Sequence, residues 1–246
     1  MNIKNYIPNA FTMGNLFSGM VGTYFAANNA LEIAAYAVLI GIFFDFFDGF
    51  FARKLNLQSE VGVQLDSLAD VITSGVVPGI IMFQLLSNTN AWGNHTQWVA
   101  ETNWQSLSIL PFFGFAITLA SAYRLAKFNV DERQSESFIG LPTPANALLI
   151  ISLPLILMYQ PNVLAENLLT NAYFLITLSL ISCVLLNAEI PLFALKFKTW
   201  GIAANKIRYG FLLLAVILLF SLQFLAIPVI ILLYVLISLI SQKNTE

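Results

Sequence analysis

Charged residues, cysteine and histidine are scarce in this 246-residue sequence. Only 10% of the residues are charged and 58% are hydrophobic, whereas soluble proteins carry about a quarter charged residues, so the sequence predicts a membrane protein. The single cysteine, Cys183, excludes an internal disulfide framework and a cysteine-based zinc cluster. A net charge of −2 provides no basic surface for a polyanion, and we therefore expect no nucleic-acid partner.

Apolar stretches of about 20 residues, the length that a spanning helix needs, recur along the chain. We therefore expect an all-α fold: a polytopic transmembrane helical bundle of about eight spans, in a single integral membrane domain that covers residues 1–246. Gln223 and Pro228 are turn signals that would split the last apolar stretch, 209–240, into two short spans. The expected helices are 10–29, 30–53, 63–86, 106–127, 144–160, 171–195, 207–223 and 224–241.

The basic residues predict the orientation of this bundle, because Lys and Arg collect in cytoplasmic loops. All of them fall on one side of the eight-helix arrangement, and the opposite loops contain none. They are Lys4, Arg53, Lys54, Arg124, Lys127, Arg133, Lys196, Lys198, Lys206, Arg208 and Lys243. We therefore expect both termini in the cytoplasm. The first apolar run contains Asn9, Thr12, Asn15 and Ser18 and is too polar for a signal peptide, so we expect it to be retained.

Four of the five aspartates lie between residues 45 and 70. Asp45 and Asp48 are three positions apart on one expected helix, and Asp66 and Asp70 are four apart on the next, so each pair projects from one helix face. Ionised side chains at membrane depth usually serve ions or substrates, and like charges this close repel unless cations neutralise them. Since no histidine or cysteine lies nearby, the oxygen ligands favour Mg²⁺ or Mn²⁺. The pattern predicts a four-aspartate metal site at the cytoplasmic edge of the membrane.

Two glycines and an arginine accompany these aspartates. Gly49 follows Asp48, and Gly62 precedes Asp66 by one helical turn, so a ligand could approach the backbone closely at both places. Arg53 follows Gly49 by four residues, and a guanidinium there suits a phosphate. An acidic metal site, an arginine and a membrane setting together indicate phosphoryl chemistry on a lipid, in which two metal ions clamp a diphosphate.

The spacing Asp45-x2-Asp48-Gly49-x2-Ala52-Arg53-x8-Gly62-x3-Asp66-x3-Asp70 resembles the motif of the CDP-alcohol phosphatidyltransferase family. Members of that family transfer the phosphatidyl part of a CDP-linked lipid to an alcohol and release CMP. The resemblance implies that Asp45, Asp48 and Asp66 bind two metal ions, and that Asp70, also near the metals, deprotonates the incoming hydroxyl. The residue pattern alone leaves open whether Asp66 or Asp70 is the base.

The same resemblance implies that Gly49, Arg53 and Ser59, together with Gly62, lie along the CDP-lipid. It also implies a six-helix core of about residues 5–200, a C-terminal helical hairpin of about 207–241, and a homodimer. Asn9, Thr12 and Asn15 form a polar stripe on the first expected helix, and we expect Asn9 and Thr12 either to contact the nucleotide or to pack against other helices.

Three further stretches resemble the phosphatidylserine synthase branch of the family. They are IPNAFTMGNLFSG at 7–19, RLAKFNV at 124–130 and GLPTPANA at 140–147. PLFALKFK at 191–198 is similar to a late basic segment of the family, whereas LLNAEI just before it departs from the pattern and leaves the role of the sixth helix open. The branch implies serine as the acceptor. Arg124, Lys127 and Asn129 are candidate acceptor contacts, or else Arg124 and Lys127 are ordinary basic anchors of a helix end.

These patterns lead to one functional hypothesis with two alternatives. CDP-diacylglycerol enters from the cytoplasmic leaflet of the cell membrane, Asp70 takes the proton of the serine hydroxyl, and phosphatidylserine and CMP form. The first alternative keeps the chemistry with glycerol 3-phosphate, inositol phosphate or an amino alcohol as the acceptor. The second is an ion or metal transporter, which would place carboxylates along a path through the membrane.

His95 lies among Trp92, Trp98 and Trp104 in an expected interfacial belt, and we assign it no chemistry.

Overall fold

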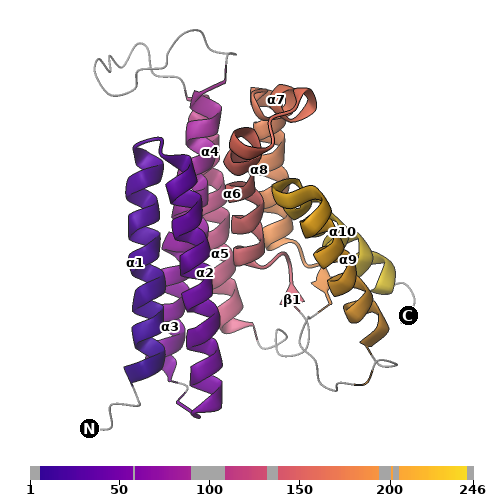
Figure 1. Cartoon of the computed structure of the whole chain (residues 1–246). Helices are drawn as coiled ribbons and strands as arrows, with labels where there is room; N and C mark the ends of the chain where they lie inside the picture. The colour runs from indigo at the N-terminus through magenta and orange to yellow at the C-terminus, as the bar shows by residue number, and fades with distance from the viewer. Residues whose placement is uncertain are drawn as a thin grey trace.

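The computed structural model describes residues 6–57, 59–89, 109–131, 138–193, 201 and 205–242, and it forms a bundle of helices (Figure 1). The α-helices are α1 (Ile7–Ala27), α2 (Leu31–Lys54), α3 (Glu60–Asp70), α4 (Val77–Ser87), α5 (Phe115–Val130), α6 (Thr143–Tyr159), α7 (Val163–Leu169), α8 (Ala172–Asn187), α9 (Lys206–Leu222) and α10 (Ala226–Gln242). Short elements complete the fold: the π-helical turn η2 (Val71–Val76), the 3₁₀ turns η5 (Leu110–Gly114) and η8 (Gln223–Leu225), and the strands β1 (Phe138–Ile139) and β2 (Pro191–Leu192). His95 and its tryptophans, Lys4, Arg133, Lys196, Lys198 and Lys243 lie outside the described residues.

Helix α1 turns small and polar side chains toward the bundle and large apolar ones outward. Thr12, Asn15 and Ser18 are buried, whereas Phe17 and Tyr24 are 68% and 66% exposed. In a bilayer, small inward residues let helices approach closely while apolar outward residues contact lipid. Helix α1 packs along α2, and the two helices stand side by side in Figure 1. This pattern of exposure supports the predicted membrane location.

Helices α3 and α4 form one continuous helix with a π-helical turn between them. The sequence predicts one helix at 63–86, and the observed helix runs from Glu60 to Ser87. It begins at 60 because the Ser59 side chain caps it by accepting a hydrogen bond from the Gly62 N–H at 3.0 Å. The turn η2 widens the helix directly after Asp70, and Thr118 Oγ1 on α5 donates a hydrogen bond to the Gly75 carbonyl within it at 2.9 Å. Such turns are frequent at functional sites.

Length and composition identify three stretches of the described residues that could cross a membrane. They are Leu31–Lys54, Glu60–Ser87 and Lys206–Ile240. Helices α7 and α8 meet at an angle of 73° and form a fourth candidate if this bent pair is one span. Helix α6 is apolar but shorter. The chain is therefore a helical membrane protein, and the full set of eight spans stays a prediction.

The sixth expected helix, 171–195, was wrong at its C-terminal end. Helix α8 ends at Asn187, and Pro191–Leu192 instead pairs as an antiparallel strand with Phe138–Ile139. Proline restricts the residue before it to extended conformations and cannot donate a helical hydrogen bond, so Pro191 favours this early ending. The short helix α7, which precedes α8, was not predicted at all.

The C-terminal apolar stretch folds back on itself as a hairpin. Gln223 has a φ of 49° and ends α9, and the rings of Phe211 on α9 and Tyr234 on α10 lie 5.7 Å apart. Because Phe211 and Tyr234 are nearly the same number of residues away from Gln223, their rings can meet only if the two helices run antiparallel. Gln160, just after α6, holds the turn: its Nε2 donates to the Leu222 carbonyl at 3.0 Å, and its Oε1 accepts from the Leu225 N–H at 3.1 Å. The predicted turn at Gln223 is confirmed.

Candidate functional site

The aspartates lie at the end of the bundle where α2 finishes and α3 begins, the lower end in Figure 1. Asp45 and Asp48 occupy the last turns of α2, and Asp66 and Asp70 occupy α3. Stacked rings of Phe11 on α1 and Phe51 on α2, 5.1 Å apart, help to hold these two helices together at this end. The site is thus built from three helices that are close in sequence.

Three of the four aspartates form a compact group. Asp45, Asp48 and Asp66 each offer a carboxylate oxygen within 4.8 Å of the others. Asp48 Oδ2 and Asp66 Oδ1 are buried and have no hydrogen-bond partner among the residues that the structure describes. A buried carboxylate oxygen without a partner is costly, and a donor set made only of carboxylates suits a hard divalent cation. These residues therefore fit the predicted Mg²⁺ or Mn²⁺ ions.

Asp70 lies outside that compact group and is held separately. It is buried, and Asn15 Nδ2 on α1 donates a hydrogen bond to its Oδ1 at 3.0 Å. The charges of Asp66 and Arg124 both act on it. The Asp70 carboxylate is therefore close enough to both Asp66 and Arg124 for their charges to influence it.

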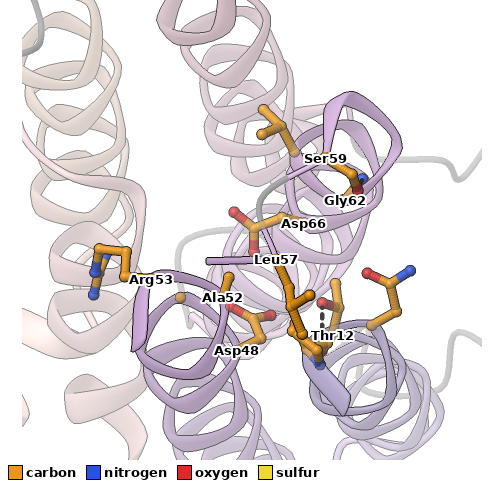
Figure 2. A pocket seen from close by; sticks show the side chains of 12 residues that line it. Thr12, Asp48, Ala52, Arg53, Leu57, Ser59, Gly62 and Asp66 are labelled. Atoms are coloured by element: carbon orange, nitrogen blue, oxygen red, sulfur yellow. Dashed lines mark hydrogen bonds between the residues drawn. The ribbon is translucent and has the colours of Figure 1, made fainter. Parts of the chain in front are cut away.

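A cleft of about 360 Å³ opens beside the aspartate group (Figure 2). All six residues that the sequence assigns to the CDP-lipid line it, and Asp48 and Asp66 contribute to the same wall. The six are Asn9, Thr12, Gly49, Arg53, Ser59 and Gly62. Figure 2 shows the carboxylates of Asp48 and Asp66 turned toward one another, while the exposed side chain of Arg53 extends from the edge of the cleft. The structure therefore brings these residues together, and their contact with a ligand stays a prediction.

The two glycines of the motif leave room in different ways. A Cβ on Gly62 would lie 3.0 Å from Ser59 Oγ and 3.5 Å from Asn9 Oδ1, so a side chain here would crowd the cap of α3 and the cleft wall. A Cβ on Gly49 would lie 3.5 Å from Arg53 Nη1, an ordinary contact. Gly49 therefore leaves a bare patch of helix beneath the guanidinium, as the spacing predicts.

The three candidate acceptor contacts have different surroundings. Arg124 is buried, and its Nη1 donates to Thr143 Oγ1 at 3.2 Å. Lys127 forms a partly exposed ion pair with Glu189 at 3.1 Å. Asn129 and the Ser67 hydroxyl exchange hydrogen bonds of 2.9 and 3.2 Å that join α5 to α3. Of the three, Arg124 is the most deeply buried, and it is the one whose charge acts on Asp70.

Two buried asparagines have surroundings that the sequence did not predict individually. Asn15 belongs to the predicted polar stripe of α1, and the structure shows that it binds Asp70. Asn146 is fully buried on α6, and within the described part of the chain neither its Oδ1 nor its Nδ2 has a hydrogen-bond partner. The signal for both was a polar amide within an apolar helix, which is unusual unless the amide serves a contact or a ligand.

Comparison with known proteins decides the family. The sequence profile described as CDP-alcohol phosphatidyltransferase matches residues 5–184 of this chain. The chain belongs to the CDP-alcohol phosphatidyltransferase family. Its aspartate group and cleft therefore lie in the part of the chain that defines this family of enzymes.

Two of the curated relatives carry the same name, and a third carries a related one. The chain is similar to the CDP-diacylglycerol–serine O-phosphatidyltransferase of Bacillus subtilis, with 30% identity over 70% of this chain and 88% of that protein. It is 34% identical to the Helicobacter pylori (strain 26695) protein of the same name, over 58% of this chain and 55% of that protein. It is also 30% identical to the archaetidylserine synthase of Methanothermobacter thermautotrophicus, over 59% of this chain and 56% of that protein. The chain thus spans most of the Bacillus relative and about half of the other two.

Proposed function

We propose that this enzyme transfers the phosphatidyl group of CDP-diacylglycerol to the hydroxyl of L-serine, giving phosphatidylserine and CMP. The observation that supports the chemistry most strongly is the group of Asp45, Asp48 and Asp66 in the wall of a cleft that Arg53 borders. The names of the relatives support serine as the acceptor.

The proposal includes two divalent cations, Mg²⁺ or Mn²⁺, held by Asp45, Asp48 and Asp66 with Asp70 nearby. The unpartnered oxygens of Asp48 and Asp66 support it, because a cation would compensate them. When bound, such ions neutralise the carboxylates and stabilise negative charge on a diphosphate.

The cleft residues bind and orient the CDP-lipid. Arg53 is exposed at the cleft edge, so its guanidinium is free to swing onto the phosphate oxygens, to which it can donate two parallel hydrogen bonds. Gly49 and Gly62 leave the backbone open to the ligand, and Asn9, Thr12 and Ser59 offer polar groups along the same wall.

Asp70 acts as the base in this proposal. It accepts the proton of the serine hydroxyl, the oxygen attacks the lipid-proximal phosphorus, and the bond from that phosphorus to the CMP oxygen breaks, so that CMP leaves. The hydrogen bond from Asn15 fixes the orientation of the Asp70 carboxylate, which a base in a transition state requires.

We also propose that the enzyme lies in the cell membrane with its cleft facing the cytoplasm and that it acts as a homodimer. Arg53 and Lys54 lie in the last turn of α2, which borders the cleft, and Lys127 lies in the last turn of α5; basic residues at helix ends favour the cytoplasmic side. The homodimer rests on family resemblance alone.

An acceptor panel tests the proposal. Purified enzyme receives CDP-diacylglycerol with L-serine, glycerol 3-phosphate, inositol phosphate or ethanolamine, and both CMP and the lipid product are measured. We expect equal amounts of CMP and phosphatidylserine with L-serine, and little product with the others. Product with another acceptor and none with serine would overturn the serine assignment. Metal flux through proteoliposomes that lack CDP-lipid would instead favour a transporter.

A further inference from the structure

The C-terminal hairpin of α9 and α10 lies beyond residues 5–184, the part of the chain that the family profile matches. The hairpin nevertheless packs against α6 (Figure 1). Many of its large apolar side chains are exposed, as expected for helices that contact lipid. Two buried residues of α10 are instead polar: Tyr234 is 7% exposed and Ser238 1%. Buried hydroxyl groups in an apolar helix need hydrogen-bond partners, so both residues indicate specific contacts.

Both hydroxyl groups bind the residue that follows β2. The Tyr234 hydroxyl donates a hydrogen bond to the Phe193 carbonyl at 3.0 Å, and Ser238 Oγ accepts one from the Phe193 N–H at 3.4 Å. The rings of Phe193 and Tyr234 also meet edge to face, 5.0 Å apart. Both backbone polar groups of Phe193 therefore bind α10, and they fix the direction of the Tyr234 hydroxyl.

Tyr234 lies in the neighbourhood of Arg124 on α5. Pro142, directly before Thr143, lines the same apolar cavity of about 350 Å³ as Tyr234, and Thr143 Oγ1 accepts a hydrogen bond from Arg124. Tyr234 and Arg124 interact electrostatically, and Arg124 interacts in the same way with Asp70. The charge of Arg124 therefore acts on both the hairpin and the proposed base.

The hydrogen-bond chemistry of Tyr234 is complementary to that of Arg124. A phenol has a single hydrogen, and here it is used on the Phe193 carbonyl, so toward other groups the oxygen can only accept. A guanidinium has five N–H donors and no acceptor, and Arg124 Nε has no hydrogen-bond partner among the described residues. A buried cation in an apolar bundle needs acceptors around it. The oriented phenolic oxygen can serve as one of them.

We propose that Tyr234 is a positioning residue, whose hydroxyl oxygen, oriented by the Phe193 carbonyl, holds the Arg124 guanidinium in place relative to Asp70. The C-terminal hairpin then contributes to catalysis as well as to membrane anchoring. The inference rests on the proposed function, because Asp70 is the base against which Arg124 is positioned. Tyr234 acts through Arg124 and contacts neither substrate.

The first test is Tyr234→Phe, which keeps the ring and removes the hydroxyl. We expect kcat for CMP release to fall roughly 10-fold, as for a lost hydrogen bond to a charged group, while the KM for CDP-diacylglycerol stays within about twofold. Ser238→Ala is the matched control, because it removes the other hydroxyl that binds Phe193, one helical turn further along α10. Its kcat should stay close to the wild-type value. Equal falls in kcat would mean that anchoring of the hairpin is what matters, and would overturn the role of Tyr234.

A double-mutant cycle tests the connection between Tyr234 and Arg124. Arg124→Lys keeps the positive charge and loses the planar fork of donors. If Tyr234 acts by holding the guanidinium, Tyr234→Phe should cost less than about threefold in kcat in the Arg124→Lys background, against roughly 10-fold in the wild type. The same loss in both backgrounds would show that Tyr234 acts independently of Arg124, which contradicts the proposal.

Unfolding temperatures in detergent show whether each variant folds. If Tyr234→Phe does not fold, Tyr234→Gln and Tyr234→Leu are compared instead. The glutamine amide can still donate to the Phe193 carbonyl and accept from Arg124, whereas leucine, of similar size, can do neither. We expect a several-fold higher kcat in Tyr234→Gln than in Tyr234→Leu. Equal values would overturn the proposal.

The outcomes separate this inference from the proposed function. CMP release is measured with whichever acceptor the wild-type enzyme uses, so failure with serine would overturn the serine assignment and leave the role of Tyr234 open to the same measurement. An unchanged kcat in Tyr234→Phe, in an enzyme that makes phosphatidylserine, would overturn the role of Tyr234 and leave the proposed function standing. A wild-type enzyme that releases no CMP with any acceptor would overturn both.

Discussion

Asn15 Nδ2 on α1 donates a hydrogen bond to Asp70 Oδ1 on α3 at 3.0 Å, and both residues are buried. The contact joins segments 55 positions apart in the chain. The backbone carbonyl of Asn15 accepts a hydrogen bond from Thr73 Oγ1 in η2 at 3.1 Å. This bond ties the π-helical turn to the backbone of α1 at Asn15. The proposed base is therefore oriented from outside its own helix.

Asn15 should consequently act as a positioning residue. In Asn15→Leu we expect kcat to fall roughly 10- to 100-fold, the effect of losing a hydrogen bond to a charged group, while both Michaelis constants stay within about twofold. The matched control is Asn28→Leu, since Asn28 is an exposed residue at the other end of α1. Equal loss of activity in the two variants would contradict the positioning role.

Gly41 is expected to be essential for packing around the same contact. A Cβ there would overlap the side chain of Thr73 and lie 2.9 Å from Asn15 Oδ1. We expect Gly41→Ala to lower stability by about 1–3 kcal/mol, as overpacking does. Gly210→Ala is the control, because a Cβ at Gly210 on α9 meets no described atom within 4 Å. Unfolding temperatures in detergent would measure both, and a neutral Gly41→Ala would show that this contact is loose.

The carboxylate group should make activity and stability depend on divalent metal. Chelation is expected to stop CMP release, and Mg²⁺ or Mn²⁺ to restore it. In the absence of substrates, the metal should also raise the unfolding temperature of the wild-type enzyme, because a ligand that binds the folded state stabilises it. Asp48→Asn should lose most of that rise. CMP release that persists after complete chelation would argue against the metal site.

The turn of the C-terminal hairpin gives a prediction about stability alone. Gln160→Leu would leave the Leu222 carbonyl and the Leu225 N–H without their present partner, at a cost of about 1–3 kcal/mol. Gln223→Gly should have the opposite effect, because glycine adopts the φ of 49° at this position without the steric penalty of a side chain. Equal unfolding temperatures for the two variants and the wild type would mean that the turn contributes little.

Much of the fold followed from sequence because long apolar runs are a local signal of helices. The apolar runs predicted helices close to the observed α1, α2 and α6, and Gln223 marked the hairpin turn. The early end of α8 could have been inferred from Pro191. The pairing of Phe138–Ile139 with Pro191–Leu192 joins residues more than 50 positions apart, and no local pattern encodes it.

The candidate site also combines features that the sequence predicts with features that only the structure shows. Helical spacing paired Asp45 with Asp48 and Asp66 with Asp70 and predicted that the two pairs meet, and the structure brings Asp45, Asp48 and Asp66 together. The hydrogen bond from Asn15 to Asp70 joins α1 to α3, and the π-helical turn η2 follows directly; neither feature leaves a clear signal in the residues. The burial of Asn146 likewise depends on how α6 packs, which only the structure shows.

The most direct test of the account compares the wild-type enzyme with Asp70→Asn, an isosteric change that removes the proposed base. Two quantities are measured: CMP release from CDP-diacylglycerol in the presence of L-serine, and binding of CDP-diacylglycerol. We expect CMP release to fall roughly 100- to 10,000-fold, the usual contribution of a general base, with binding of the CDP-lipid retained. Normal CMP release by Asp70→Asn would contradict the account.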